Sequence, residues 1–418
     1  MVVISNGFNK FHLSVAAAEA QKRGLLTAFI TGAYPNPFLC ECLRLLKCSQ
    51  QRKIARLLAR KEAIPDCLVH AMLWSEILYQ IPYLLNNQYL TELSMKLNVK
   101  SFLDYGNRAA TRLRIATSKG AKLYHYRAGF GNRSVEIAKS LGMFTLCDHS
   151  IVHPMILDYM VNHNGAWPDA GAQLELSAIW QLIMDDVLQA DAVLVNSDFV
   201  KETFIYQGYN AANLNVIYSG VDDAFYSAAL RCADQRPRDH SSRPLRVLFA
   251  GSFEKRKGIE VVMEAFRRNH DLNCELTIAG TIAAKVRKSN VDFFSDLRVR
   301  ECGALSREEL ALQMSRADVF LFPSLAEGSA RVIFEAMLCG CYIITTNNSG
   351  SIVINNEHGR IVMPGDVHQT VMALEEAVMD REKVWEIGQT NQSLIQSKYR
   401  QSCYGDNLAK LYWRLLAR

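Results

Sequence analysis

The sequence predicts an α/β fold with two Rossmann-like, doubly wound parallel-sheet domains that face a cleft. Short apolar runs of strand type alternate with helical patterns along both halves of the chain. Its 418 residues exceed one ordinary domain of about 100 to 200 residues. A polar, proline-bearing stretch without periodicity, residues 231–244, separates the two sets of strands. We therefore expect two sheets rather than one.

The predicted strands are short apolar runs bounded by turn residues. In the first half they are residues 2–5, 25–31, 122–128, 144–150, 192–197 and 215–220. In the second half they are residues 245–251, 274–280, 299–304, 318–324, 341–347 and 359–364.

These strands predict the domain organisation. An N-terminal Rossmann-like domain covers residues 1–230 and contains a helical insertion at about 36–110. After the linker at 231–244, a second Rossmann-like domain covers residues 245–394. Residues 395–418 are predicted as a helix that packs back toward the N-terminal domain, because its apolar residues share one side.

Composition limits the class of protein. A hydrophobic content of 49% and a charged content of 21% are sufficient for real cores. The first 140 residues hold 20 Lys and Arg against 8 acids, whereas residues 141–200 hold neither Lys nor Arg, so the basic surplus is local. Eleven irregularly spaced cysteines favour reduced thiols in the cytoplasm, and no apolar run approaches the ~20 residues of a membrane span. We expect neither disulfides nor a nucleic-acid partner.

Residues 327–335, E-G-S-A-R-V-I-F-E, predict a loop-to-helix junction behind the buried strand 318–324. The free N–H groups at the start of a helix and the positive end of its dipole favour phosphate there. Glu327 lies outside this helix and Glu335 lies about a turn and a half inside it. The two carboxylates would therefore contact different parts of one long ligand, which indicates a sugar-nucleotide site.

Residues 251–258, G-S-F-E-K-R-K-G, join a predicted strand to a helix. Gly251 permits close backbone approach, and Arg256 and Lys257 can neutralise a diphosphate. The alternative is a solvated helix start. Cations at a helix N-terminus oppose the dipole by about 0.3–1 kcal/mol each, which favours the functional interpretation.

Six motifs in order carry a resemblance to a known family. They are N-G-F-N-K-F-H (6–12), A-D-A-V-L-V-N-S (190–197), N-V-I-Y-S-G-V-D (215–222), L-F-A-G-S-F-E-K-R-K-G-I-E (248–260), A-E-G-S-A-R-V-I-F-E-A-M-L-C-G (326–340) and T-N-N-S-G-S (346–351). The chain resembles the GT-B fold, retaining glycosyltransferases of family 4, glycosyl transferases group 1. The resemblance implies sugar transfer from a nucleoside diphosphate sugar to a carbohydrate or lipid-linked hydroxyl acceptor, without a metal or other cofactor. It also implies polysaccharide, lipopolysaccharide or glycolipid biosynthesis as the setting.

The resemblance implies roles for the donor-side residues. Glu335 would hold the ribose, Glu327 would meet the donor sugar, and Lys257 would stabilise the leaving diphosphate. Where the family commonly has Arg after the glycine, this chain has Ser252. Arg256 would then fill the second cationic role, or the diphosphate would be held more weakly. The expected donor-binding residues are Ser252, Arg256, Lys257, Glu327, the backbone N–H groups of Gly328, Ser329 and Ala330, and Glu335. An ion pair between Glu335 and Arg331 is the alternative for that carboxylate.

The resemblance also implies an acceptor side on the N-terminal domain. His149 matches the position near the reacting carbon, so that the catalytic candidates are His149, Glu327 and Lys257. Asp148 ends the same strand, at the sheet edge where open sheets place their chemistry. His12 and His125 are the further acceptor-side candidates. A purely structural role for His149 is the alternative.

Two further interpretations stay open. The basic, Leu-bearing segment 40–62 is either an inserted helical pair with a solvated basic face or a peripheral contact with the inner face of a membrane. For function, the alternatives are a catalytically silent carbohydrate-binding protein and, less favoured, a nucleotide-dependent oxidoreductase, because no G-x-G-x-x-G follows the first strand of either domain. Cys339 and Cys341 are expected to be packing residues rather than zinc ligands.

Overall fold

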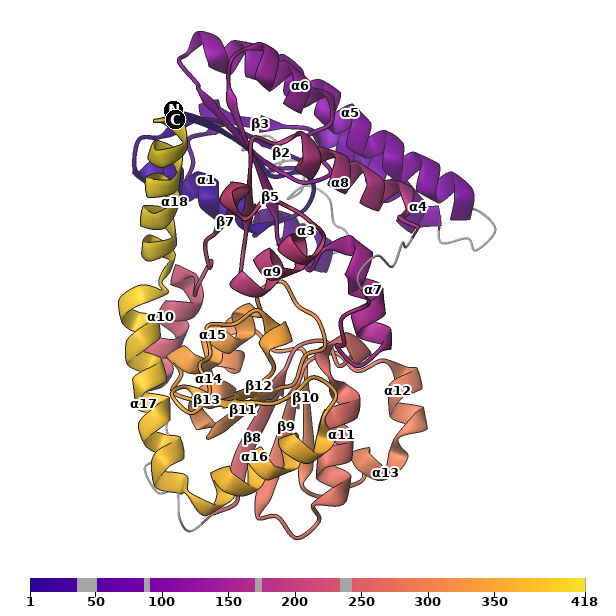
Figure 1. Cartoon of the computed structure of the whole chain (residues 1–418), viewed down its shortest axis with the longest axis vertical. Helices are drawn as coiled ribbons and strands as arrows, with labels where there is room; N and C mark the ends of the chain where they lie inside the picture. The colour runs from indigo at the N-terminus through magenta and orange to yellow at the C-terminus, as the bar shows by residue number, and fades with distance from the viewer. Residues whose placement is uncertain (36–50, 86–90, 170–174, 234–242, 418) are drawn as a thin grey trace.

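Two open parallel sheets organise the molecule, each with helices on both faces (Figure 1). The computed structural model describes residues 1–35, 51–85, 91–169, 175–233 and 243–417. The N-terminal sheet has the strand order β3-β2-β1-β4-β5-β6-β7, and the C-terminal sheet has the order β10-β9-β8-β11-β12-β13. Every strand pair is parallel. The predicted fold class is confirmed.

The N-terminal sheet consists of β1 (Val2–Ser5), β2 (Leu26–Thr31), β3 (Val69–Ala71), β4 (Leu123–Arg127), β5 (Phe144–His149), β6 (Ala192–Val195) and β7 (Leu214–Val216). Its helices are α1 (His12–Lys22), α3 (Gln51–Leu58), α4 (Leu73–Leu85), α5 (Thr91–Ser118), α6 (Arg133–Ser140), α7 (Pro154–Asn162), α8 (Ala178–Gln189), α9 (Asp198–Tyr206) and α10 (Asp223–Cys232). Strand β3 was not predicted, because it is a three-residue edge strand without an apolar run.

The C-terminal sheet consists of β8 (Leu245–Ala250), β9 (Cys274–Ala279), β10 (Val299–Gly303), β11 (Val319–Phe322), β12 (Tyr342–Thr345) and β13 (Gly359–Ile361). Its helices are α11 (Ile259–Arg268), α12 (Ala284–Ser289), α13 (Val291–Phe294), α14 (Arg307–Arg316), α15 (Arg331–Leu338), α16 (Val367–Met379) and α17 (Arg381–Lys398). The last helix, α18 (Gln401–Leu416), follows α17 along the same side of the molecule (Figure 1).

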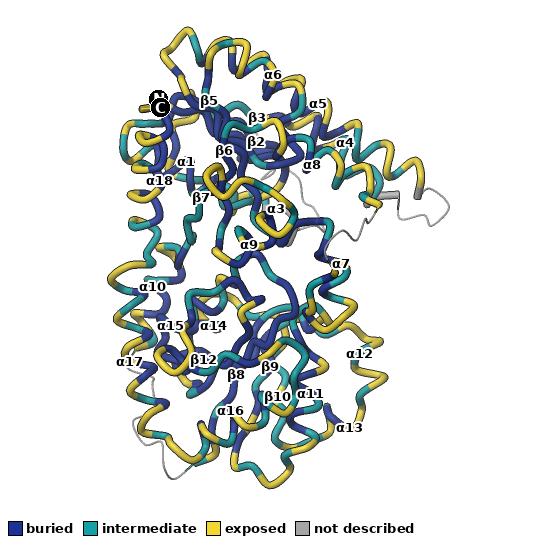
Figure 2. Tube along the Cα trace, viewed as in Figure 1, coloured by how far each residue is buried: buried dark blue, intermediate teal, exposed yellow. Residues whose placement is uncertain are grey.

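The burial pattern explains why the strands could be recognised. Strands β1, β6, β11 and β12 are buried at every position, since helices cover both faces of each sheet. Figure 2 shows the buried trace running through the sheets and the exposed trace on the outer helices. A continuous apolar run is therefore the expected signature of each central strand.

The C-terminal helix joins the two domains. Helix α17 packs against α15 and β12 of the C-terminal domain, whereas α18 packs against α1 of the N-terminal domain. The residues of α18 that enter the N-terminal core are Tyr404, Leu408, Leu411, Tyr412 and Leu415. A second contact between the domains is apolar, because Ala326 packs among residues of α7 and α9 such as Ile156, Met160 and Phe199.

Two of the predicted segments, the basic segment and the interdomain linker, lie partly outside the described residues. Residues 40–50 of the basic segment and residues 234–242 of the linker lie outside the described residues, while residues 51–58 form α3. The described helices include none that is both long and apolar enough to cross a bilayer.

Candidate active site

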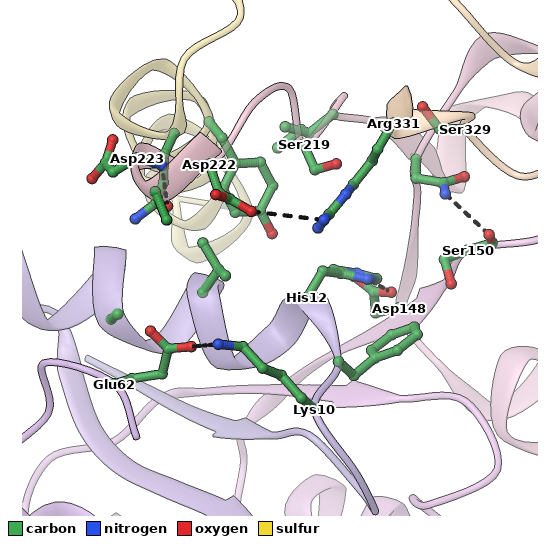
Figure 3. Close-up of a pocket in the computed structure, with 18 of the residues that line it drawn as sticks. Lys10, His12, Glu62, Asp148, Ser150, Ser219, Asp222, Asp223, Ser329 and Arg331 are labelled. Atoms are coloured by element: carbon green, nitrogen blue, oxygen red, sulfur yellow. Dashed lines mark hydrogen bonds and ion pairs between the residues drawn. The ribbon is translucent and has the colours of Figure 1, made fainter. Parts of the chain in front are cut away.

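A cavity of about 750 Å³ lies between the two domains (Figure 3). The carboxyl ends of the N-terminal strands form one wall, and the loops that precede α14 and α15 contribute to the other. Its polar lining includes Lys10, His12, Asp148, Ser150 and Asn196 from the N-terminal domain, Arg307, Ser329 and Arg331 from the C-terminal domain, and Gln401 and Tyr404 from α18. Residues that are far apart in the sequence thus line the same cavity.

The predicted acceptor-side residues lie together. His12, the first residue of α1, places Nε2 2.8 Å from Oδ1 and 2.9 Å from Oδ2 of Asp148. His125 lies behind them, fully buried, with Nε2 3.4 Å from Asp148 Oδ2 and Nδ1 2.7 Å from the Tyr412 hydroxyl. Burial alone would raise the pKa of Asp148, but His12 and His125 hold it well below its usual range. A carboxylate thus lies between two imidazoles, one facing the cavity and one facing α18.

His149 does not line the cavity. Its side chain is 4% exposed and packs edge-on against Phe204, with ring centroids 5.0 Å apart. Burial lowers the pKa of His149 to about 4, so that the ring is neutral near pH 7. His153, which caps α7, also packs on Phe204. In this conformation the imidazole of His149 packs on Phe204, while its Nε2 is buried without a hydrogen-bond partner among the described residues. The predicted contact of His149 with the donor stays a prediction.

Lys257 occupies the edge of the C-terminal sheet beyond β8. Its ammonium lies 5.7 Å from the centre of the Phe322 ring and directly over Gly251, where an added Cβ would stand 2.7 Å from Nζ. No carboxylate of the described residues forms an ion pair with this half-buried ammonium. Ser252, beside it, is also half-buried. The loop therefore presents a cation without a counter-ion.

Arg256 and Glu327, both predicted to contact the donor, contact each other. Arg256 Nη1 lies 2.8 Å from Glu327 Oε2, and its Nη2 lies 3.2 Å from Glu254 Oε1. The same Nη1 donates to the carbonyl of Ala326 at 3.0 Å. The Arg256 charge is thus already offset, whereas Lys257 is half-buried and has no ion pair among the described residues.

The predicted phosphate cradle is smaller than expected. The Ala330 N–H donates to the Ser349 carbonyl at 3.0 Å, so it is not free for a ligand, and this part of the prediction is corrected. Among the described residues, nothing accepts a hydrogen bond from the N–H groups of Gly328 and Ser329. Ser349, in the loop over residues 346–351, thus accepts the hydrogen bond of the Ala330 N–H, which is the third predicted phosphate donor. The local sequence did not indicate this contact.

Gly328 fits between the domains. Its carbonyl accepts a hydrogen bond from Ser197 Oγ of the N-terminal domain, and an added Cβ would lie 1.9 Å from the Ser150 carbonyl oxygen. Asn196 Nδ2 donates to that same Ser150 carbonyl at 3.0 Å. A side chain at position 328 would push the donor loop away from the N-terminal domain.

Glu335 is half-buried on α15. Burial raises the pKa of Glu335 to about 7, although Arg331 and Arg307 oppose the shift. The alternative ion pair with Arg331 does not form, because Arg331 Nη2 lies 3.7 Å from Asp222 Oδ2 instead (Figure 3). Arg307 pairs with the same Asp222 carboxylate. Glu335 thus keeps a carboxyl without an ion pair among the described side chains.

Sequence reasoning missed several lining residues. Asn196 is the next-to-last residue of one motif quoted above and Asp222 is the last residue of another, and their place after a predicted strand was the available signal. Tyr404 and Gln401 gave no signal, because their helix is distant in sequence from both sheets. In the described parts of the chain, no three His, Cys, Asp or Glu side chains gather as a metal site. Cys339 and Cys341 are buried, and the Cys341 thiol donates to the Met314 carbonyl at 3.2 Å.

Part of the chain is similar in sequence to known glycosyltransferases. Residues 233–394, which hold Lys257, Glu327 and Glu335, match the family model described as Glycosyl transferases group 1. The D-inositol 3-phosphate glycosyltransferase of Pseudarthrobacter chlorophenolicus is 26% identical over 234 residues, which cover 46% of this chain and 55% of that protein. The amylovoran biosynthesis glycosyltransferase AmsK of Erwinia amylovora is 25% identical over 239 residues, which cover 54% and 57%. The chain thus spans about half the length of these curated relatives.

The whole fold has solved counterparts. The crystal structure of Anabaena Alr3699/HepE in complex with UDP matches 99% of this chain and 100% of that one, with a TM-score of 0.63 and 14% identity. At that identity the likeness shows the fold alone, which is GT-B.

Proposed function

We propose that this chain is a group 1 glycosyltransferase, which moves a sugar from a nucleoside diphosphate sugar to an acceptor hydroxyl. One observation carries the proposal: the unpaired ammonium of Lys257, the free amides of Gly328 and Ser329, and the unpaired carboxyl of Glu335 share one sheet edge. They do so because β8 and β11, which precede them, are neighbouring strands. Cation and amides suit a diphosphate, and a carboxyl suits paired ribose hydroxyls.

The solved neighbour with UDP supports a uridine nucleotide as the first donor to test. In this proposal, Lys257 and the two amides bind the diphosphate, and Glu335 binds the ribose. Charge builds on the diphosphate as it departs. A preorganised cation aimed there supplies a few kcal/mol of transition-state stabilisation.

For the chemistry we propose transfer with retained anomeric configuration and without a metal. The acceptor hydroxyl attacks from the face that the diphosphate leaves, and a leaving phosphate oxygen accepts its proton. The ion pair of Glu327 with Arg256 at 2.8 Å supports a binding role rather than a nucleophilic one for that carboxylate. Mass-spectrometric trapping of a sugar covalently bound to Glu327 would refute this mechanism.

The setting is also a proposal. The name of another relative, the capsular polysaccharide biosynthesis glycosyltransferase CapM of Staphylococcus aureus, supports polysaccharide biosynthesis. We propose a carbohydrate or lipid-linked acceptor at the cytoplasmic face of a membrane. Co-sedimentation with anionic phospholipid vesicles tests the membrane contact. A pellet fraction no larger than with neutral vesicles speaks against it.

A nucleotide panel tests the donor class. UDP, GDP, ADP and NAD are compared by thermal shift, since a ligand that binds the native state raises stability by RT ln(1 + [L]/Kd). We expect UDP to raise the melting temperature most and NAD to have no effect. Stabilisation by NAD alone would favour an oxidoreductase. A response to UDP without transfer to any acceptor would favour a silent binding protein.

A further inference from the structure

We infer that the interdomain cavity selects an uncharged, hydroxyl-rich acceptor, a glycosyl unit without phosphate, and that Tyr404 and Asn196 are its specificity-determining residues. The inference rests on the proposed function, because it concerns the acceptor of the same transfer reaction. In this inference, α18 contributes side chains to the acceptor site.

Three residues that line the cavity each have a buried neutral polar atom without a hydrogen-bond partner among the described residues. The Tyr404 hydroxyl, Asn196 Oδ1 and Ser329 Oγ are each buried without a hydrogen-bond partner in the described structure. Tyr404 is 4% exposed, and its ring is held in the N-terminal core. Buried polar groups normally have partners, so three orphans around one cavity indicate that a ligand supplies them.

The chemistry of these atoms suits hydroxyl groups. The Asn196 amide already donates to Ser150, so its free oxygen can only accept, whereas the Tyr404 hydroxyl can donate. A sugar hydroxyl both donates and accepts. It can therefore satisfy either atom without bringing a charge into the cavity.

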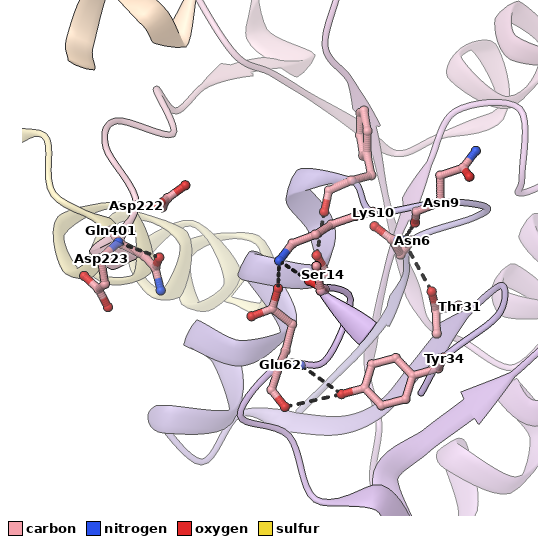
Figure 4. A network of polar contacts seen from close by, with 12 residues as sticks. Asn6, Asn9, Lys10, Ser14, Thr31, Tyr34, Glu62, Asp222, Asp223 and Gln401 are labelled. Atoms are coloured by element: carbon pink, nitrogen blue, oxygen red, sulfur yellow. Dashed lines mark hydrogen bonds and ion pairs between the residues drawn. The ribbon is translucent and has the colours of Figure 1, made fainter. Parts of the chain in front are cut away.

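The charged lining is already balanced. Four cations and four carboxylates line the cavity: Lys10, Lys22, Arg307 and Arg331, and Glu62, Asp148, Asp222 and Asp223. Lys10 Nζ lies 3.0 Å from Glu62 Oε1 (Figure 4), and Lys22 Nζ lies 3.6 Å from Asp223 Oδ2. Arg307 and Arg331 share the Asp222 carboxylate, and Asp148 pairs with His12.

Among the described lining residues, a phosphorylated acceptor would meet only cations that already have an ion pair. Its phosphate would have to separate Arg307 or Arg331 from Asp222, while the Asp148 and Asp222 carboxylates repel it. The cavity therefore discriminates against phosphate by leaving no cation free for it.

Matched pairs of ligands test the inference by direct binding in the presence of UDP. Methyl glucoside, methyl galactoside, methyl mannoside and inositol are each compared with their monophosphates by saturation-transfer NMR and titration. We expect at least one neutral ligand to bind, with its monophosphate binding about 10-fold more weakly or worse. Tyr404→Phe and Asn196→Ala should each lower the affinity for the neutral ligand by about 10-fold, because each variant loses one hydrogen bond to it. The affinity for UDP should be unchanged.

Two further variants sharpen the test. Asp222→Asn keeps an α10 cap but removes the charge that holds Arg307 and Arg331, so it should improve binding of the monophosphate relative to the neutral ligand by about 10-fold. Tyr226→Phe, at a tyrosine that packs against Arg400 outside the cavity, is the matched control and should change neither affinity.

The inference fails if wild-type protein binds a monophosphate as tightly as its neutral partner, or if UDP binds and no ligand of either class does. It fails equally if Tyr404→Phe and Asn196→Ala leave the neutral ligand unaffected. Absence of UDP binding to the wild type would instead refute the proposed function.

Discussion

Lys257 offers the sharpest test among single residues. Its ammonium has no ion pair to lose, so Lys257→Met should leave the free energy of unfolding within about 0.5 kcal/mol of wild type. If it stabilises the departing diphosphate, transfer should slow by about 100-fold or more. Stopped-time product analysis by mass spectrometry measures the rate. Lys255→Met, at the exposed lysine of the same turn, is the control and should retain activity.

Glu335 predicts a pH dependence of nucleotide binding. Burial raises its pKa to about 7, so the free protein holds a proton there below that pH. Ribose hydroxyls that donate to the ionised carboxylate would lower the pKa, and UDP binding near pH 6.5 should therefore release a proton. Affinity should rise as pH increases toward 7 and then level off. Calorimetry in buffers of different ionisation enthalpy measures the proton, which Glu335→Gln should abolish.

The same carboxyl has a consequence for stability. Its folded pKa lies above the unfolded value of 4.5, so the unfolded state releases its proton first and stability falls between about pH 4.5 and 7. Glu335→Gln should remove this decline and be the more stable protein at pH 8, by about 1–3 kcal/mol. Urea unfolding at pH 5 and pH 8 measures the difference. A variant equally destabilised at both values would show that the carboxyl is not the cause.

At the scale of elements, α18 carries two tyrosines, Tyr404 and Tyr412, whose substitution by Phe should affect stability differently. Tyr412 donates to or accepts from His125 at 2.7 Å, so Tyr412→Phe should destabilise the protein by about 1–3 kcal/mol and loosen the contact of His125 with Asp148. The Tyr404 hydroxyl has no partner in the described structure, so Tyr404→Phe should be neutral or stabilising in the ligand-free protein. The midpoints of denaturant unfolding compare the stability of the two variants. An equal loss of stability in both would contradict the assigned contacts.

The parts of the molecule that sequence could predict are those that are local in the chain. Central strands such as β1 and β11 were found because burial on both faces leaves a continuous apolar run. Lys257 and Glu335 could be predicted as candidate site residues because each follows a buried strand within a short motif. The Arg256–Glu327 pair and the Ala330–Ser349 hydrogen bond join different loops, so no spacing along the chain indicates them.

At the scale of the whole molecule, a cleft between the domains was predicted, but the set of side chains that lines the cavity was not. His12 on α1 and Tyr404 on α18 meet there only because the chain returns from the C-terminal domain to the N-terminal core. An apolar side on α18 predicts that it packs, but not on which side chains. Charge balance in the cavity depends equally on pairs such as Lys22 with Asp223, which no local pattern relates.

Contact between the domains gives the last prediction. Asn348 Nδ2 donates to the Gly165 carbonyl of the N-terminal domain at 2.9 Å and to the Leu325 carbonyl at 2.8 Å, while the backbone carbonyl of Asn348 accepts from the Glu327 N–H. Asn348→Ala removes the bridge and leaves buried carbonyls unpaired, at a cost of about 1–3 kcal/mol.

The donor loop should then be less firmly held against the N-terminal domain. We expect a larger radius of gyration in solution scattering and a higher KM for the donor. Asn347→Ala, at the exposed neighbour, is the control. An unchanged radius of gyration together with an unchanged KM would mean that other contacts, such as the Ala326 cluster, suffice to hold the domains together.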